Sequence, residues 1–185
     1  VTSMVIAFAA QETLSNFFSG IFILVDRPFK EGDTIILPSG DWCRVEHIGL
    51  RSTRLYRYSD HSILTVPNTS LIKDVIANYS LPDNITVHSF TIGVSYDADP
   101  VKVREILFDI LKKNEYVLVD DEHKPIVRFN GFGDSSIDFF VKYHIRSLDD
   151  KTEAINSVNT DILKRFNEEG IEIPYPITTV IKKGG

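Results

Sequence analysis

Apolar residues dominate the first 25 positions, and in the second half of that stretch they recur with a helical period. Six of them are spaced i, i+3, i+4, i+7, i+8 and i+11, along one side of an α-helix: Leu14, Phe17, Phe18, Ile21, Phe22 and Val25. Arg27-Pro28 predicts the end of this helix, because proline lacks the N–H that a further turn requires. The pattern fits the core helix of a soluble domain, or a helix that meets a membrane or another copy of the chain.

The first ten residues form a second apolar stretch, with Met4 and Phe8 one helical turn apart among small alanines. Small side chains allow helices to pack closely in lipid, so this stretch could be part of a membrane helix. The alternative is that it forms the frayed N-terminal helix of a soluble domain. A membrane span needs about 20 apolar residues, and Gln11-Glu12-Thr13 separates the two stretches. No basic leader and no initiator Met begins the sequence, so we expect it to be part of a longer protein.

Residues 32–78 carry several short apolar segments separated by turn residues, which predicts a small β-barrel. In one segment Cys43, Val45 and His47 alternate with Arg44, Glu46 and Ile48, as the two faces of a strand do. Pro67-Asn68 closes the last strand, and the Asn68 side chain is expected to cap a helical turn at residues 69–72.

Beyond a boundary predicted at residues 81–84, the hydrophobic period changes. A strand at 85–95 precedes a helix that begins at Asp97-Ala98-Asp99-Pro100, and strands at 126–132 and 137–145 precede a helix that Gly170 ends. This βαββα order predicts an α+β, ferredoxin-like sandwich without its last strand. The first helix is expected to bury six apolar residues: Val101, Val103, Ile106, Leu107, Ile110 and Leu111. A final strand at 177–181 follows two prolines and is expected to leave the domain.

Composition narrows the function classes. The net charge of −6 argues against a nucleic-acid partner, because phosphate binding needs clustered basic residues. The lone Cys43 excludes an intrachain disulfide and suits a reducing compartment. No catalytic motif is present, so no enzyme is predicted, and neither a metal nor a cofactor is expected. Residues 120–123 are expected to be a solvated loop, and the basic cluster of Arg51, Arg54 and Arg57 to form ion pairs.

Several motifs then recur in a fixed order along the chain. They are Leu14-Ser15-Asn16-Phe17-Phe18-Ser19-Gly20-Ile21, Asp26-Arg27-Pro28-Phe29, Gly32-Asp33, Ile48-Gly49-Leu50-Arg51-Ser52-Thr53, Val66-Pro67-Asn68, Ile92-Gly93-Val94-Ser95-Tyr96-Asp97, Asp134-Ser135-Ser136-Ile137 and Ile173-Pro174-Tyr175-Pro176. In this order the chain closely resembles the small-conductance mechanosensitive channel family, the MscS-like channels, over essentially its whole length.

The resemblance implies a division into four parts. Residues 1–28 would be the end of the pore-lining helix and an amphipathic interfacial helix, and 29–80 an Sm-like β domain. Residues 81–174 would be the α/β domain, and 175–185 a strand for a parallel β-barrel between subunits. The family implies a homo-oligomer, a heptamer, in the inner membrane, with residues from about Arg27 onward in the cytoplasm. Such a channel opens under membrane tension and releases ions and small osmolytes on hypoosmotic shock.

Site residues follow from the same resemblance. The constriction of the pore corresponds to Met4 and Phe8, and the helix bend and gating to Gln11, Asn16 and Gly20. Contacts with lipid or neighbouring helices would come from Phe17, Phe18 and Phe22.

Glu12 has two interpretations: a carboxylate ring that favours cations, or a helix residue that faces away from the pore. The alternative to a channel is a soluble Sm-like module that binds RNA through Arg44, Arg51, Arg54 and Arg57 with Tyr56 or Tyr58.

Overall fold

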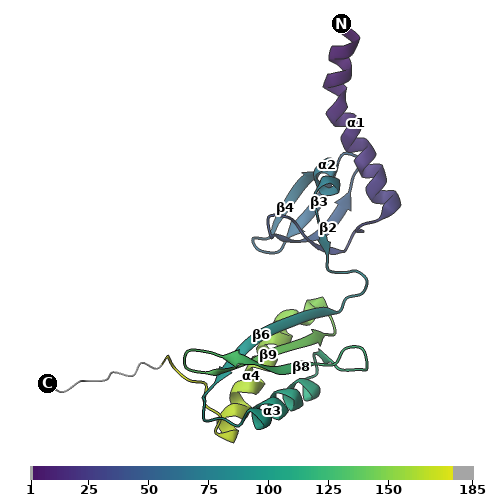
Figure 1. Cartoon of the computed structure of the whole chain (residues 1–185). Helices are drawn as coiled ribbons and strands as arrows, with labels where there is room; N and C mark the ends of the chain where they lie inside the picture. The colour runs from purple at the N-terminus through teal and green to yellow at the C-terminus, as the bar shows by residue number, and fades with distance from the viewer. Residues whose placement is uncertain (1, 177–185) are drawn as a thin grey trace, which may run out of the picture. The chain divides into compact units, whose positions relative to one another are not determined.

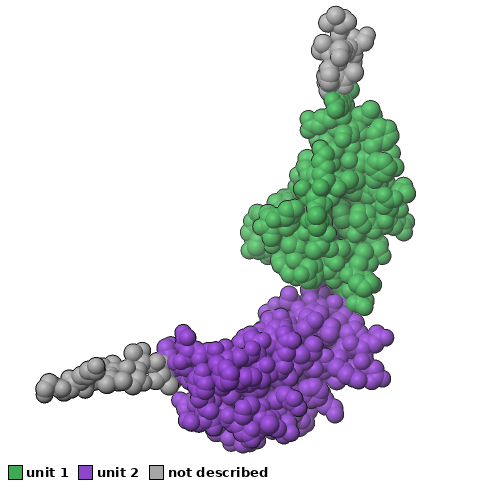
Figure 2. All heavy atoms as spheres, in the orientation of Figure 1, with its two compact units in different colours: residues 1–84 green, residues 85–185 purple. Residues whose placement is uncertain are grey.

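The computed structural model describes the backbone of residues 2–176 and the side chains of residues 10–176. It divides the chain into two compact units, residues 1–84 and 85–185 (Figure 2). Each unit has its own hydrophobic core: the apolar core residues of the first lie between Ile23 and Leu71, and those of the second between Val94 and Ile171. The strand predicted at 177–181 lies outside the described residues.

The first unit consists of a long helix and a small β domain (Figure 1). Helix α1, Thr2–Asp26, is continuous through Gln11 and Glu12 and ends immediately before Arg27-Pro28, as predicted. Five antiparallel strands follow in the order β4-β3-β2-β1-β5. Their bounds are Thr34–Ile36 (β1), Trp42–Ile48 (β2), Ser52–Arg57 (β3), Ser62–Pro67 (β4) and Ala77–Asn78 (β5), with helix α2 at Asn68–Lys73.

Two predictions for the β domain are corrected. The predicted alternation in β2 holds at Cys43 and Val45, which are buried, but His47 is exposed. The pairing of β2 with β3 shifts register between Val45 and His47, and such a bulge turns the following side chains over. Asn68 does not cap α2, because its side chain is buried and bonded elsewhere.

The second unit is an α+β layer structure, as predicted. Strand β9 is central: β6 pairs with one edge, and β8 and β7 share the other, all antiparallel. The elements are β6 (Thr86–Val94), α3 (Pro100–Lys113), β7 (Val117–Leu118), β8 (Ile126–Phe132), β9 (Ile137–Ile145), the 3₁₀ turn η1 (Leu148–Asp150) and α4 (Lys151–Glu169). The short β7 was not predicted from the sequence.

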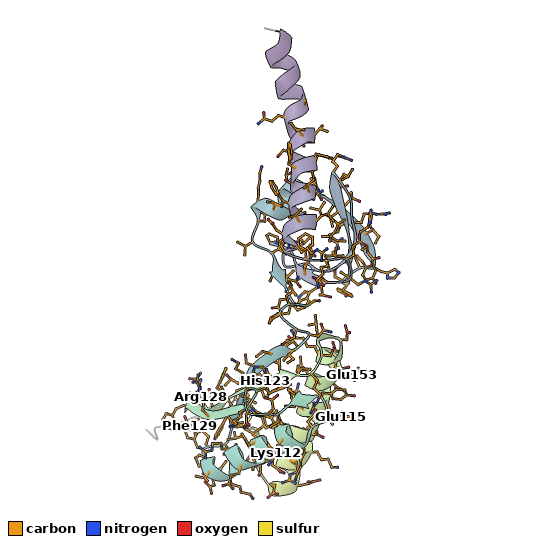
Figure 3. All side chains as sticks on the ribbon, turned by 90° about the vertical axis from the view of Figure 1, so that its right-hand side faces the viewer. Lys112, Glu115, His123, Arg128, Phe129 and Glu153 are labelled. Atoms are coloured by element: carbon orange, nitrogen blue, oxygen red, sulfur yellow. The ribbon has the colours of Figure 1, made fainter. Side chains whose placement is uncertain are left out.

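Side chains alternate across this sheet. In β9 every second residue from Ile137 to Ile145 is buried against the helices. On β8, Phe129 meets the core residue Phe139, whereas its neighbour Arg128 lies over the ring of Phe140. Figure 3 labels Phe129 and Arg128 on this strand.

Helix α3 begins as predicted, because the Asp99 side chain accepts a hydrogen bond from the Val101 N–H, with Pro100 in the first position. Val101 itself is 61% exposed, so its assignment to the buried face is wrong; the other five residues predicted there are buried.

Candidate functional site

The side of α1 that faces the β domain is not the apolar stripe. Its buried residues are Asn16, Ser19, Gly20 and Ile23, spaced i, i+3, i+4 and i+7 along the helix. Three of the four are small or polar, and only Ile23 enters the apolar core of the β domain. The predicted stripe lies on the other side and is largely exposed: Phe22 is 54% and Val25 70% exposed.

Asn16 is the polar centre of this contact and is only 4% exposed. Its Oδ1 accepts hydrogen bonds from the backbone N–H of Thr69 at 3.1 Å and from Thr69 Oγ1 at 3.0 Å. Its Nδ2 donates to the Glu12 carbonyl, one turn earlier, at 3.1 Å. Asn16 therefore satisfies a free N–H in the first turn of α2, the role predicted for Asn68, and so joins the two helices.

Gly20 allows the closest approach of α1 to the β domain. A Cβ at this position would lie 2.5 Å from the Leu50 carbonyl oxygen and 2.6 Å from Nδ2 of Asn68. Asn68 in turn accepts a hydrogen bond from Thr53 Oγ1 at 2.9 Å and donates to the Gly49 carbonyl at 2.9 Å. Any side chain at residue 20 would displace this network, so the contact depends on glycine.

The chain reverses direction directly after α1. Arg27 has φ of +51°, in the left-handed region that non-glycine residues rarely occupy. The following segment is fixed to the β domain by Phe29, which is buried, and by Asn78, whose Nδ2 donates to the Pro28 carbonyl at 3.1 Å and to Asp33 at 2.8 Å. The end of α1 thus has a defined direction relative to the sheet.

Glu31 attaches the same segment to the bulge in β2. Its Oε1 accepts the backbone N–H of Ile48 at 2.9 Å and lies 2.9 Å from Nδ1 of His47. The hydrogen bond from the Ile48 N–H lowers the pKa of the Glu31 carboxyl, and His47 lowers it by a smaller amount. This group therefore stays ionised at neutral pH.

The exposed side of α1 is a contiguous apolar surface. Its members are Leu14, Phe17, Phe18, Phe22, Leu24 and Val25, and the rings of Phe17 and Phe18 meet edge to face at 5.9 Å. Next to Phe22, a groove of about 470 Å³ lies between the end of α1, α2 and the segment after α1. None of the described helices is long and apolar enough to cross a membrane.

The structure places the predicted site residues in two groups. Asn16 and Gly20 come together with Thr69, Asn68 and Leu50, three residues that the sequence analysis did not assign to the site. Gln11, Glu12, Phe17, Phe18 and Phe22 are exposed. Met4 and Phe8 belong to α1, but their side chains lie outside the described ones. The spacing of Asn16, Ser19, Gly20 and Ile23 was the available signal for the buried face.

Several alternative sites are accounted for by contacts within the chain. Arg44 pairs with Glu46 and lies over Tyr56, and Arg57 pairs with Asp60. No group of three metal-ligating side chains occurs among residues 10–176. Cys43 is fully buried, as expected, and burial raises the pKa of its thiol.

Known proteins similar to this chain are mechanosensitive channels. The family described as "Mechanosensitive ion channel, beta-domain" matches residues 12–81, and "Mechanosensitive ion channel MscS, C-terminal" matches residues 88–173. The large-conductance mechanosensitive channel MscMJLR of Methanocaldococcus jannaschii is 38% identical over 99% of this chain and 51% of its own length. The small-conductance channel MscMJ of the same organism is 34% identical over 97% of this chain and 51% of its own length.

A solved structure has the same fold. The closed-state crystal structure of Helicobacter pylori MscS superposes with a TM-score of 0.82 and 25% identity, over 100% of this chain and 71% of that chain. The chain spans about half the length of the curated relatives it matches.

Proposed function

We propose, from the premise that this chain belongs to the MscS-like family of mechanosensitive ion channels, that it forms the pore-side helix and the cytoplasmic part of a tension-gated channel. The complete protein would open when membrane tension rises and release ions and small osmolytes on hypoosmotic shock. It would lie in the inner membrane, with residues from about Arg27 onward in the cytoplasm.

The observation that carries this proposal is the division of α1 into two faces. One face, Asn16 to Ile23, is fixed to the β domain, while the opposite face exposes large apolar residues. Such a surface is unfavourable in water, since each fully buried Phe contributes about 1.5–3 kcal/mol. Phe17, Phe18 and Phe22 would therefore contact lipid or the helices of neighbouring subunits.

The pore would require several copies of the chain, and seven is the number that we propose. Met4 and Phe8 would then form rings of apolar side chains that exclude water and block ions when the rings are narrow. Glu12 would form a ring of carboxylates near the inner mouth of the pore and favour cations. Gln11, Asn16 and Gly20 would determine how α1 bends or turns relative to the β domain during opening.

The Asn16–Thr69 contact suggests how the β domain takes part in opening of the channel. A change in tension that moves α1 either carries α2 and the β domain along or breaks the two hydrogen bonds of Asn16. The contact would therefore couple the pore to the cytoplasmic part of the chain. No catalytic step enters this mechanism, and we propose no enzymatic activity.

The intact protein, expressed in a bacterial strain that lacks its own mechanosensitive channels, tests the proposal. We expect it to restore survival of hypoosmotic shock and to give currents in excised patches that appear only under suction. Particle images of the purified protein should have sevenfold rings. A protein that purifies as a soluble monomer and gives no tension-dependent current would contradict the proposal.

A further inference from the structure

Three aromatic rings, Tyr96, Phe129 and Phe132, form a cluster on the second unit, just after β6 and at the end of β8. Tyr96 and Phe132 lie in nearly parallel planes with ring centres 6.2 Å apart, and Phe129 meets Phe132 edge to face at 5.2 Å. Phe129 also packs on the core residue Phe139 at 5.7 Å. This aromatic cluster is therefore attached to the core of the unit.

The backbone around the aromatic cluster is closely packed and hydrogen-bonded. The Tyr96 hydroxyl donates to the Gly133 carbonyl at 2.7 Å, and the Gly133 N–H donates to the Ser136 carbonyl at 2.7 Å. A Cβ on Gly133 would lie 2.6 Å from Ser136 Oγ, so the turn between β8 and β9 has no spare room. The rings are therefore held in place before any partner binds, and binding would cost little conformational entropy.

The aromatic cluster is nevertheless exposed to water. Phe132 is 76% exposed, and Tyr96 and Phe129 are half-exposed. Exposed aromatic patches on rigid backbone are typical of binding surfaces, because stiff rings bury a large area at a small entropic cost. Surfaces lined by aromatic rings bind proline-rich segments in particular, since the extended backbone of such segments is already ordered.

The chain carries a segment of this kind next to the aromatic cluster. After α4 the backbone returns to the end of β6, where the Ser95 N–H donates to the Glu172 carbonyl at 2.9 Å. Ile173-Pro174-Tyr175-Pro176 follows, and its two prolines restrict the backbone to an extended form. Tyr175 is 82% exposed, so its ring makes little contact within its own chain. The segment thus starts beside the aromatic cluster of its own chain and leaves that cluster uncovered.

We propose that the aromatic cluster binds residues 173–176 of a second copy of the chain. This inference rests on the proposed function, because it requires an assembly of several copies. Each copy carries both the surface and the segment that fits it, so the contact runs from one subunit to the next and closes in a ring. The segment also leads directly into the strand between subunits that the family resemblance implies, so it continues toward neighbouring copies.

The test identifies what touches residue 132 in the complete channel. The photoreactive amino acid p-benzoylphenylalanine replaces Phe132, the irradiated channel is separated under denaturing conditions, and the joined peptides are identified by mass spectrometry. We expect products larger than one chain, in which residue 132 is joined to residues 173–176 of another copy. The matched control carries the same amino acid in place of Phe108, a half-exposed phenylalanine of α3, and should give no such product.

A second variant changes the segment in place of the surface. Pro174→Ser combined with Pro176→Ser frees the backbone of the segment, so most of the joined product should be lost. Glu168→Ser, at an exposed position of α4, should retain it.

A product joined within one chain, to lipid or to a different protein, would overturn the inference, and so would the absence of any product. Crosslinking does not depend on current, so the two proposals fail separately. Joined copies without tension-dependent current would contradict the proposed function alone, whereas a conducting channel without this product would contradict only the inference.

Discussion

Asn16 and Gly20, one turn apart on α1, show how two small residues define a contact that larger ones could not form. Asn16 supplies the hydrogen bonds to Thr69, and Gly20 supplies the space for Leu50 and Asn68. Both residues lie on the face opposite the apolar stripe. The specificity of the contact therefore comes from shape and hydrogen bonding, with Ile23 as its apolar anchor.

Asn16→Ala is expected to lower the free energy of unfolding by about 1–3 kcal/mol, because Thr69 loses an acceptor in a partly buried place. In excised patches, the same variant should change the tension threshold or the rate of closing, since the link between α1 and α2 is broken. Ser15→Ala, at the exposed neighbouring position, is the control and should leave both quantities near wild type. A wild-type threshold in Asn16→Ala would mean that the contact has no part in gating.

Gly20→Ala tests the close approach. Alanine favours a helix over glycine by about 1 kcal/mol, so the intrinsic effect is stabilising. The new Cβ would lie 2.5 Å from a backbone carbonyl that cannot rotate away, and such overpacking costs about 1–3 kcal/mol. We expect a net decrease in the melting temperature measured by circular dichroism. An increase would indicate that the loop at Leu50 yields without cost.

Helix α1 is arranged differently from the helices of the second unit. Helix α3 buries five apolar residues and presents charged residues outward, as a soluble amphipathic helix does. In α1 the buried face is mostly small or polar and the exposed face is apolar. This inversion fits a helix whose second partner is lipid or another subunit.

Phe8→Ser tests the constriction proposed near the beginning of the same helix. If Phe8 forms an apolar constriction, a hydroxyl in its place will stabilise water in the pore and lower the tension needed for opening. The measurement is the threshold pressure in excised patches of the complete channel. Ser15→Ala, at an exposed polar position of the same helix, is the control and should leave the threshold unchanged. An unchanged threshold in Phe8→Ser would remove Phe8 from the gate.

At the scale of the whole molecule, the chain consists of two units with separate cores. The stability of each unit therefore depends on pH through the titratable groups buried in that unit. In the second unit, burial is the main cause that lowers the pKa of His88 and of His144 below 6.5. Positive charge nearby adds to this effect, from Lys151 at His88 and from His123 and Lys142 at His144. Both histidines therefore favour the neutral form in the folded state.

The second unit should consequently lose stability in mild acid. Below about pH 6.5 the unfolded chain binds more protons at these histidines than the folded chain, so their contribution is present above that pH and is lost as the pH falls through the lowered pKa. The melting temperature by circular dichroism should be lower at pH 5 than at pH 7.5. The difference should shrink in the double variant His88→Gln, His144→Gln. An equal difference in that variant would assign the effect to other groups.

The sequence by itself determined most of the elements, though not the short strand β7. Arg27-Pro28 ended α1, Asp99-Pro100 began α3 and Gly170 ended α4, because these signals depend on local backbone geometry and on hydrogen bonds within one turn. The βαββα order followed from the same local patterns, and the ordered motifs indicated the family.

Only the tertiary structure decided which side of α1 faces the β domain. Asn16 and Thr69 are 53 positions apart, and no local pattern reports such a contact. From the sequence, the apolar stripe could face a protein core, a membrane or another copy of the chain, because periodicity measures only hydrophobicity. The contact with the β domain is instead formed by a glycine-sized gap and a carboxamide. The bulge that exposes His47 and the buried bonds that divert Asn68 from capping were missed for the same reason: each depends on a neighbouring strand or loop that the sequence does not place.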